Sequence, residues 1–216
     1  MVKIKICGLK RLEDIEIVNK YKPDYIGFVF ADSKRKVSHK TAKLLKDYLS
    51  SDILSVGVFV DSPENEILEL YDEGIVDVVQ LHGNESEEFI LNLKEKTNYK
   101  IKIINAIEMY DGIDVKKYDN SKADYLLFDS GKGSGKTFDW NLIRNDLKKD
   151  FFLAGGLSIS NVCDAIKEFN PYAVDLSSSL ETDGFKDENK IKKIMEVINW
   201  VEDDMENMVG NISLKH

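Results

Sequence analysis

Two residues of this 216-residue chain have the chemical types needed to move protons, and each ends a short apolar run. Cys7 follows the alternating stretch KIKI, and Asp129 follows YLLF. A thiolate can accept a proton and a carboxylic acid can donate one, if each has a suitable pKa. Taken singly, Cys7 is better explained as a small buried residue and Asp129 as a cap. Gly8 is expected after Cys7 because a side chain there would obstruct either the turn or a bound substrate.

Two segments near the end of the chain have the composition of a phosphate-binding site. AGGLS, from Ala154 to Ser158, joins an apolar run to Ser158-Ile159-Ser160, which offers N-caps for a helix. Glycine lets the backbone approach an anion closely, and free N–H groups at a helix N-terminus point towards it. Taken alone, AGGLS is explained equally well as a tight turn, but a serine run follows the next apolar run. Together the segments predict phosphate contacts at Gly155, Gly156, Ser178 and Ser179.

Three other polar segments also follow apolar runs. ADSKRKVS contains Arg35 between two lysines, and QLHG contains His82, which we expect either at the rim of a pocket or in a structural hydrogen bond. GKGSGK, from Gly131 to Lys136, lacks the spacing of a nucleotide-binding P-loop. We therefore interpret it as a flexible loop over the site.

Eight runs rich in β-branched and aromatic residues predict eight strands, and most segments between them have apolar residues at helical spacing. Such alternation predicts parallel βαβ units, and eight units can close into a single-domain (β/α)8 TIM barrel. A doubly wound open sheet is the alternative. In both architectures function lies at the carboxyl ends of the strands, where all the segments above fall. The predicted strands are Val2–Cys7, Tyr25–Phe30, Leu54–Val60, Val76–Leu81, Lys100–Ala106, Tyr125–Asp129, Phe151–Ala154 and Ala173–Leu176.

The alternation in the first strand predicts which of its side chains point into the barrel. Ile4 and Ile6 share one face, which is expected to meet the helices. Lys3, Lys5 and Cys7 share the other face, so Cys7 is expected at the inner rim of the barrel.

Composition limits the classes of protein that remain. The chain is 43% hydrophobic and has a formal net charge of -9, which argues against nucleic acid or an anionic membrane as a partner. Its two cysteines form no disulfide framework, its N-terminus does not resemble a signal peptide, and no apolar run is long enough to span a membrane. We predict a cytoplasmic protein with a barrel over residues 1–205 and a frayed C-terminal tail over 206–216, present as a monomer or a homodimer.

The ordered set of motifs resembles one family closely. KICG, GFVF, VGVFV, VQLHG, LLFDS, FDW, LAGGL, NV and VDLSS occur in this order, and they resemble phosphoribosylanthranilate isomerase of tryptophan biosynthesis over nearly the whole chain. The resemblance implies a (β/α)8 barrel that needs no metal and no organic cofactor. It also implies an Amadori rearrangement of a phosphorylated small molecule, N-(5-phosphoribosyl)anthranilate, to 1-(2-carboxyphenylamino)-1-deoxyribulose 5-phosphate.

The resemblance also implies roles for individual residues. Cys7 would be the general base and Asp129 the general acid, while Arg35 would meet the anthranilate carboxylate. We expect Asp175 to hold a sugar hydroxyl or to act as a neighbouring carboxylate, and His82 is a further candidate for substrate binding. This chemistry requires a raised pKa at Asp129 and a lowered pKa at Cys7. Lys5 is the expected source of positive potential for Cys7.

The chain departs from the family pattern at Lys34, where relatives usually have proline, and at Ser179, where they usually have glycine. Neither change removes a catalytic group.

Three alternatives to the isomerase function are less well supported. An indoleglycerol-phosphate synthase would need a lysine and glutamate set that is not found, and a histidine-pathway isomerase would have aspartate at the position of Cys7. A barrel that only binds a phosphorylated ligand would not need both Cys7 and Asp129.

Overall fold

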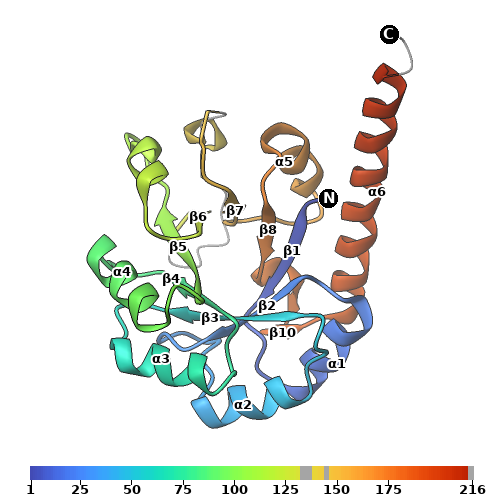
Figure 1. Cartoon of the computed structure of the whole chain (residues 1–216). Coiled ribbons are helices and arrows are strands. Elements are labelled where there is room, and N and C mark those ends of the chain that lie inside the picture. Colours follow the sequence, from blue (N-terminus) through green and yellow to red (C-terminus); the bar gives the residue numbers. More distant parts are fainter. Residues whose placement is uncertain (132–137, 144–145, 214–216) are drawn as a thin grey trace.

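The protein is described by a computed structural model over residues 1–131, 138–143 and 146–213. Eight parallel strands pair in chain order, and the eighth pairs with the first, so the sheet closes into a barrel (Figure 1). This confirms the predicted (β/α)8 barrel and excludes the open sheet. The strands are β1 (Lys3–Cys7), β2 (Tyr25–Val29), β3 (Leu54–Phe59), β4 (Val78–Leu81), β5 (Lys102–Glu108), β6 (Tyr125–Asp129), β7 (Phe151–Leu153) and β8 (Ala173–Leu176).

Helices surround the barrel and connect its strands (Figure 1). After β5 and β6, where the sequence has no clear helical stripe, the described connections contain only short 3-10 helices. The α-helices are α1 (Leu12–Tyr21), α2 (His39–Asp47), α3 (Glu64–Asp72), α4 (Glu87–Lys96), α5 (Val162–Phe169) and α6 (Glu188–Ser213). The 3-10 helices are η1 (Val115–Asn120), η2 (Trp140–Leu142) and η3 (Ser178–Leu180).

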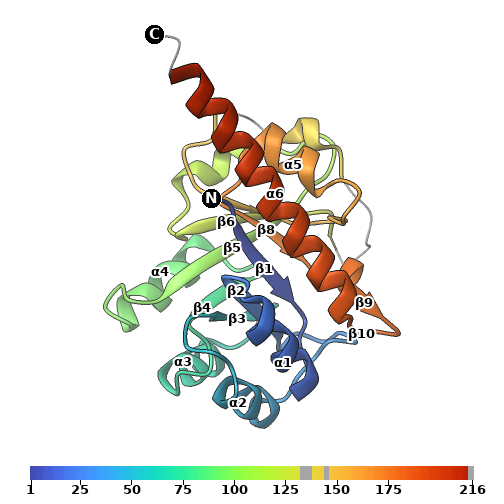
Figure 2. The ribbon, with the colours of Figure 1, turned by 90° about the vertical axis from the view of Figure 1, so that its right-hand side faces the viewer.

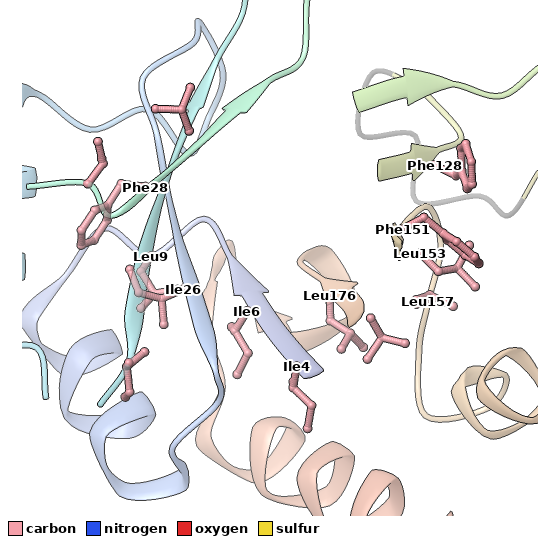
Figure 3. Packing of buried hydrophobic residues seen from close by; sticks show 14 of the residues in the cluster. Ile4, Ile6, Leu9, Ile26, Phe28, Phe128, Phe151, Leu153, Leu157 and Leu176 are labelled. Carbon is pink, nitrogen blue, oxygen red and sulfur yellow. The ribbon is translucent and has the colours of Figure 1, made fainter. Parts of the chain in front are cut away.

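The strands separate an outer apolar layer from the interior of the barrel. Ile4 and Ile6 belong to the large cluster between the sheet and the helices, as Figure 3 shows for β1. Lys5 and Cys7, on the opposite face of the same strand, are buried inside the barrel. The faces predicted for this strand are therefore confirmed, and Cys7 lies at the end of β1.

Several predicted boundaries were wrong, among them the start of β4, which lies at Val78 and was predicted at Val76. Strand β5 continues to Glu108, two residues beyond the predicted end, because its pairing with β6 extends that far. The N-cap of α5 is Asn161, so the helix begins after the predicted Ser158-Ile159-Ser160 caps.

The last part of the chain forms a hairpin and a long helix. Strands β9 (Glu181–Thr182) and β10 (Phe185–Lys186) form the hairpin next to the start of α6 (Figure 2). Helix α6 packs against α1 and α5 and remains helical to Ser213, so the predicted tail begins within a helix. The division into a barrel and a tail stays a prediction. None of the helices in the described part of the chain is long and apolar enough to cross a membrane.

Candidate active site

A buried ion pair lies below Cys7 inside the barrel. Lys5 Nζ donates a hydrogen bond of 2.8 Å to Asp175 Oδ2, and the two side chains are 0% and 8% exposed. The register of β1 and β8 places Lys5 directly beside Asp175. Burial lowers the pKa of Lys5, but the Asp175 carboxylate and Cys7 outweigh this effect and raise that pKa above its ordinary value. Lys5 is therefore a permanent cation next to the thiol.

The pKa of Cys7 is shifted in the direction opposite to the expected one. Burial raises the pKa of the thiol and the Asp175 carboxylate adds to this shift, so the pKa stays above its ordinary value although Lys5 and Lys186 lower it. The expectation that Lys5 lowers the Cys7 pKa below its ordinary value was therefore wrong, because burial disfavours the thiolate more strongly. Gly27 provides room for the sulfur, since a Cβ at that position would lie 2.6 Å from Cys7 Sγ.

Asp129 and His82 form a second pair of facing side chains, at the ends of β6 and β4. His82 Nε2 lies 3.4 Å from Asp129 Oδ2, and His82 Nδ1 lies 2.9 Å from Gln80 Nε2. Because the Gln80 amide nitrogen is a donor, Nδ1 faces this amide and Nε2 faces Asp129. The hydrogen bond predicted as one alternative for His82 is therefore present, while its place at the rim of a pocket stays a prediction.

The pKa of Asp129 also differs from the expected direction. Burial raises this pKa, but the hydrogen bond and charge of His82, with backbone N–H groups of Ser130 and Gly131, lower it below its ordinary value. The raised pKa predicted for a general acid was therefore wrong. Asp175 shows the raised pKa instead, because it is buried, and the nearby Asp129 adds to the shift against the opposing effect of Lys5.

Arg35 is held by a carboxylate that the sequence did not single out. Its Nε and Nη2 donate hydrogen bonds of 2.7 and 2.9 Å to the two oxygens of Glu181. Its aliphatic stem covers Gly8, where a Cβ would lie 2.3 Å from Arg35 Cδ. Gly8 also has φ +89°, so neither the turn nor the arginine tolerates a side chain there. The first of the two reasons predicted for Gly8 is confirmed, and Arg35 supplies a reason that was not foreseen.

The predicted phosphate residues lie in two loops that follow β7 and β8. Gly155 and Gly156 have φ +77° and +68°, and a Cβ on Gly155 would lie 2.7 Å from Ser130 N. Asn161 Nδ2 donates to Gly156 O at 3.1 Å and thereby fixes this loop. Because α5 begins after Asn161, the glycine amides precede the helix by several residues and do not form its first turn.

The serine loop after β8 contributes polar groups of a different kind. Ser178 is exposed, whereas Ser179 Oγ is buried and has no hydrogen-bond partner among the described residues. Ser177 Oγ donates to Cys7 O at 3.0 Å and so joins this loop to the end of β1. The side chain that distinguishes Ser179 from the usual glycine therefore adds a buried hydroxyl group with its bonding capacity unused.

These contacts bring the predicted residues together at the carboxyl ends of the strands. Ser177 connects the serine loop to Cys7, while a Cβ on Gly155 would lie 3.2 Å from Asp129 Oδ1. The charges of Asp129 and His82 reach Asp175 and alter its pKa. Lys34 lies outside this group, and its carbonyl accepts a bond from Lys10 Nζ at 3.3 Å. The predicted loop GKGSGK lies outside the described residues after Gly131.

Three residues of the site were not selected from the sequence: Gln80, Glu181 and Lys186. Gln80 was visible at a strand end, but its contact with His82 depends on the strand continuing to Leu81. Glu181 and Lys186 lie in a hairpin whose polar residues are typical of an exposed turn. Their sequence gives no sign that the side chain of Lys186 is buried, which the folded structure shows. Among the described residues, no group of three or more His, Cys, Asp or Glu side chains is placed to hold a metal ion.

The barrel and the polar groups at its strand ends define a (β/α)8-barrel enzyme. A family model described as N-(5'phosphoribosyl)anthranilate (PRA) isomerase matches residues 4–197. The N-(5'-phosphoribosyl)anthranilate isomerase of Clostridium acetobutylicum is 48% identical over 203 residues, which cover 90% of this chain and 97% of that protein. The chain therefore belongs to the N-(5'-phosphoribosyl)anthranilate isomerase family, as its motifs predicted, and has the isomerase role in tryptophan biosynthesis.

Two solved structures extend the comparison to three dimensions. One is a phosphoribosyl anthranilate isomerase in complex with reduced 1-(o-carboxyphenylamino)-1-deoxyribulose 5-phosphate. It is 34% identical, has a TM-score of 0.80, and the match covers 91% of this chain and 97% of that one. The other, from Thermotoga maritima, is described as monomers generated from a dimeric isomerase. It is also 34% identical, with a TM-score of 0.80 and coverage of 91% and 98%.

Proposed function

We propose that the chain rearranges N-(5'-phosphoribosyl)anthranilate by general acid–base catalysis, with Cys7 as the base and Asp129 as the acid. The observation that carries this assignment is that each proposed catalytic group lies at a strand end beside a second ionisable side chain. Cys7 lies beside the buried cation Lys5, and Asp129 lies beside His82. A thiol and a carboxyl group on different strands can act on different atoms of one bound sugar.

The reaction proceeds in three steps on these groups. Asp129 gives a proton to the ribose ring oxygen, so the ring opens to an iminium ion. Cys7 then removes the proton from the adjacent sugar carbon, and the resulting enolamine tautomerises to the ketone. The iminium nitrogen takes up the electron pair released by the broken C–H bond, so atoms and charge balance without a cofactor or metal.

The pKa shifts of Asp129 and Cys7 determine which protonation state of the site is the most populated at neutral pH. The pKa of Asp129 is lowered and that of Cys7 is raised, so the main form at neutral pH has ionised Asp129 and a neutral thiol. The reactive form has the proton on Asp129 and not on Cys7. Both forms contain the same number of protons, so their ratio is constant between the two pKa values. We therefore expect a broad plateau of kcat/KM across neutral pH.

The remaining predicted residues bind the substrate. Arg35 meets the anthranilate carboxylate, and its planar guanidinium suits this group. Asp175 Oδ1 is buried with no hydrogen-bond partner among the described residues, which favours a sugar hydroxyl as its ligand. The phosphate lies over Gly155, Gly156, Ser178 and Ser179, and the unused hydroxyl of Ser179 supports this placement. His82 contacts the sugar beside Asp129.

We further infer a cytoplasmic enzyme that acts on this small phosphorylated substrate and has neither nucleic acid nor a membrane as its partner. The net charge of -9 supports both exclusions. The chain is a monomer or a homodimer, and the dimeric isomerase described for Thermotoga maritima makes the homodimer a specific possibility to test by sedimentation.

An activity assay with two cysteine variants tests this proposal. The purified protein should convert phosphoribosylanthranilate formed in situ, with loss of its fluorescence. Cys7→Ser should retain the fold but lower kcat by about 10²–10⁴-fold, because a serine hydroxyl is a far weaker base than a thiolate. Cys163→Ser on α5 is the matched control and should keep normal activity. Absence of conversion by the wild-type protein would reject the function, and normal turnover by Cys7→Ser would reject Cys7 as the base.

A further inference from the structure

A fully buried lysine lies next to the residues that hold Arg35. The side chain of Lys186 is 0% exposed, and its Nζ donates hydrogen bonds to Glu181 Oε1 at 2.9 Å and to Ser177 O at 3.1 Å. Burial lowers its pKa below the ordinary value, and the Glu181 carboxylate opposes this shift only in part. A lysine without access to water is retained in a fold only when its charge is paired in this way.

The hairpin between η3 and α6 creates the pairing of Lys186 and Glu181. Asp183 and Gly184 have φ +53° and +76°, as a tight two-residue turn requires. The register of this turn places Lys186 directly opposite Glu181. Cross-strand neighbours of opposite charge stabilise each other, so the hairpin fixes the carboxylate before any ligand binds.

Glu181 is shared between two cations. Its Oε1 accepts from both Lys186 Nζ and Arg35 Nε, and its Oε2 accepts from Arg35 Nη2. The side chains of Arg35 and Glu181 are only 19% and 11% exposed. Lys186 therefore orients the carboxylate, and the carboxylate in turn orients the guanidinium.

The formal charges of Arg35, Lys186 and Glu181 add up to a net charge of +1. Arg35 and Lys186 each contribute +1 and Glu181 contributes -1, whereas Arg35 and Glu181 alone would be neutral. Arginine has five N–H donors, and Glu181 uses two of them, so three are left for another group. A single net positive charge on a planar guanidinium matches one carboxylate.

We propose that Lys186 is a positioning residue for carboxylate recognition, which fixes Glu181 and thereby Arg35 and supplies the positive charge that Glu181 would otherwise cancel. This inference rests on the proposed contact between Arg35 and the anthranilate carboxylate. It assigns the β9–β10 hairpin a part in substrate selection. The hairpin should matter for ligands that contain the carboxylate and not for ligands that lack it.

Two ligands that differ only in this group separate such a role from general support of the fold. The first is reduced 1-(o-carboxyphenylamino)-1-deoxyribulose 5-phosphate, and the second is the same molecule with phenyl in place of carboxyphenyl. Isothermal titration calorimetry gives both Kd values for each variant. Lys186→Met preserves side-chain volume but removes the charge, so it should weaken the first ligand by about tenfold or more and leave the second unchanged.

Two further variants keep the test decisive if Lys186→Met folds poorly. Lys186→Arg retains the charge and should retain the preference for the carboxylate. The double variant Glu181→Gln/Lys186→Met leaves Arg35 as the one charge of the trio, because it also removes the carboxylate that would cancel the charge of Arg35. Because its net charge equals that of the wild type, this double variant should recover much of the preference that Lys186→Met loses.

The outcomes separate this inference from the assignment of Arg35. If the wild type prefers the carboxylate ligand and Arg35→Ala removes the preference, the Arg35 contact stands. Lys186 is then rejected as a positioning residue if Lys186→Met weakens both ligands equally, or if the double variant shows no recovery. If the wild type binds both ligands equally, the Arg35 contact and the role of Lys186 are both overturned.

Discussion

A single added methyl group at Gly8 should disturb substrate binding through Arg35. In Gly8→Ala the new Cβ would lie 2.3 Å from Arg35 Cδ, whereas two carbon atoms in contact lie about 3.5 Å apart. The stem of Arg35 must therefore move by about 1 Å, since the position of the new Cβ is fixed by the backbone of residue 8. Such a shift breaks the bonds of 2.7 and 2.9 Å to Glu181, because hydrogen bonds weaken beyond about 3.2 Å.

Two energies follow from this geometry. The backbone of residue 8 has φ +89°, and a non-glycine residue in such a conformation costs about 1–3 kcal/mol of the free energy of unfolding. For a chain of this size each kcal/mol lowers Tm by about 2–4 °C. Displacement of Arg35 by about 1 Å should lower kcat/KM by up to about 100-fold. We expect most of this loss in KM, because Arg35 binds the substrate and does not transfer a proton.

Gly74 provides a matched control for the backbone cost. It has φ +69°, and a Cβ there would have no atom within 4 Å. Gly74→Ala should therefore lower Tm by a similar amount but leave KM unchanged. Thermal unfolding and steady-state kinetics of both variants give the comparison. Wild-type KM in Gly8→Ala, with Tm lowered as in Gly74→Ala, would refute the argument that the Arg35 stem requires a glycine.

Two further predictions concern the charged pairs inside the barrel. Lys5→Met should cost about 3–5 kcal/mol of the free energy of unfolding, measured with urea, because Asp175 is left buried and unpaired. Lys5→Met/Asp175→Asn should recover part of this loss, and no recovery would show that the pair is not the cause. His82→Gln removes the partner that lowers the Asp129 pKa, so that pKa should rise. The acid limb of the pH profile of kcat/KM should then move to higher pH, and a shift in the opposite direction would contradict the assignment.

The architecture could be predicted from local patterns because those patterns repeat. Alternation in KIKIC separates the outer face of β1 from its inner face, and the structure confirms both. Strand ends also gather at one edge of a parallel barrel, so the sequence alone was enough to group Cys7 with Asp129. The end of β5 was wrong because strand length depends on pairing with β6, which the sequence of β5 does not specify.

The electrostatics of the site could not be predicted in the same way. The pKa of Cys7 depends on the balance between burial and two lysines, and Lys186 is far from Cys7 in the chain. The pKa of Asp129 depends on His82, whose ring orientation is set by Gln80 on the same strand. Residue types indicate which groups can titrate, but the sign of each shift is set by neighbours that only the closed barrel brings together.

The two buried lysines explain how a thiol base can be kept in so enclosed a site. Lys5 is paired with Asp175 and Lys186 with Glu181, so neither cation is left without a partner. Both lower the Cys7 pKa, yet burial, with Asp175, raises it above its ordinary value, which favours the protonated thiol. The thiolate is also the form that oxidants attack. On the proposed roles, burial therefore protects Cys7 by favouring the thiol, while the two lysines lower the cost of forming the thiolate that acts as the base.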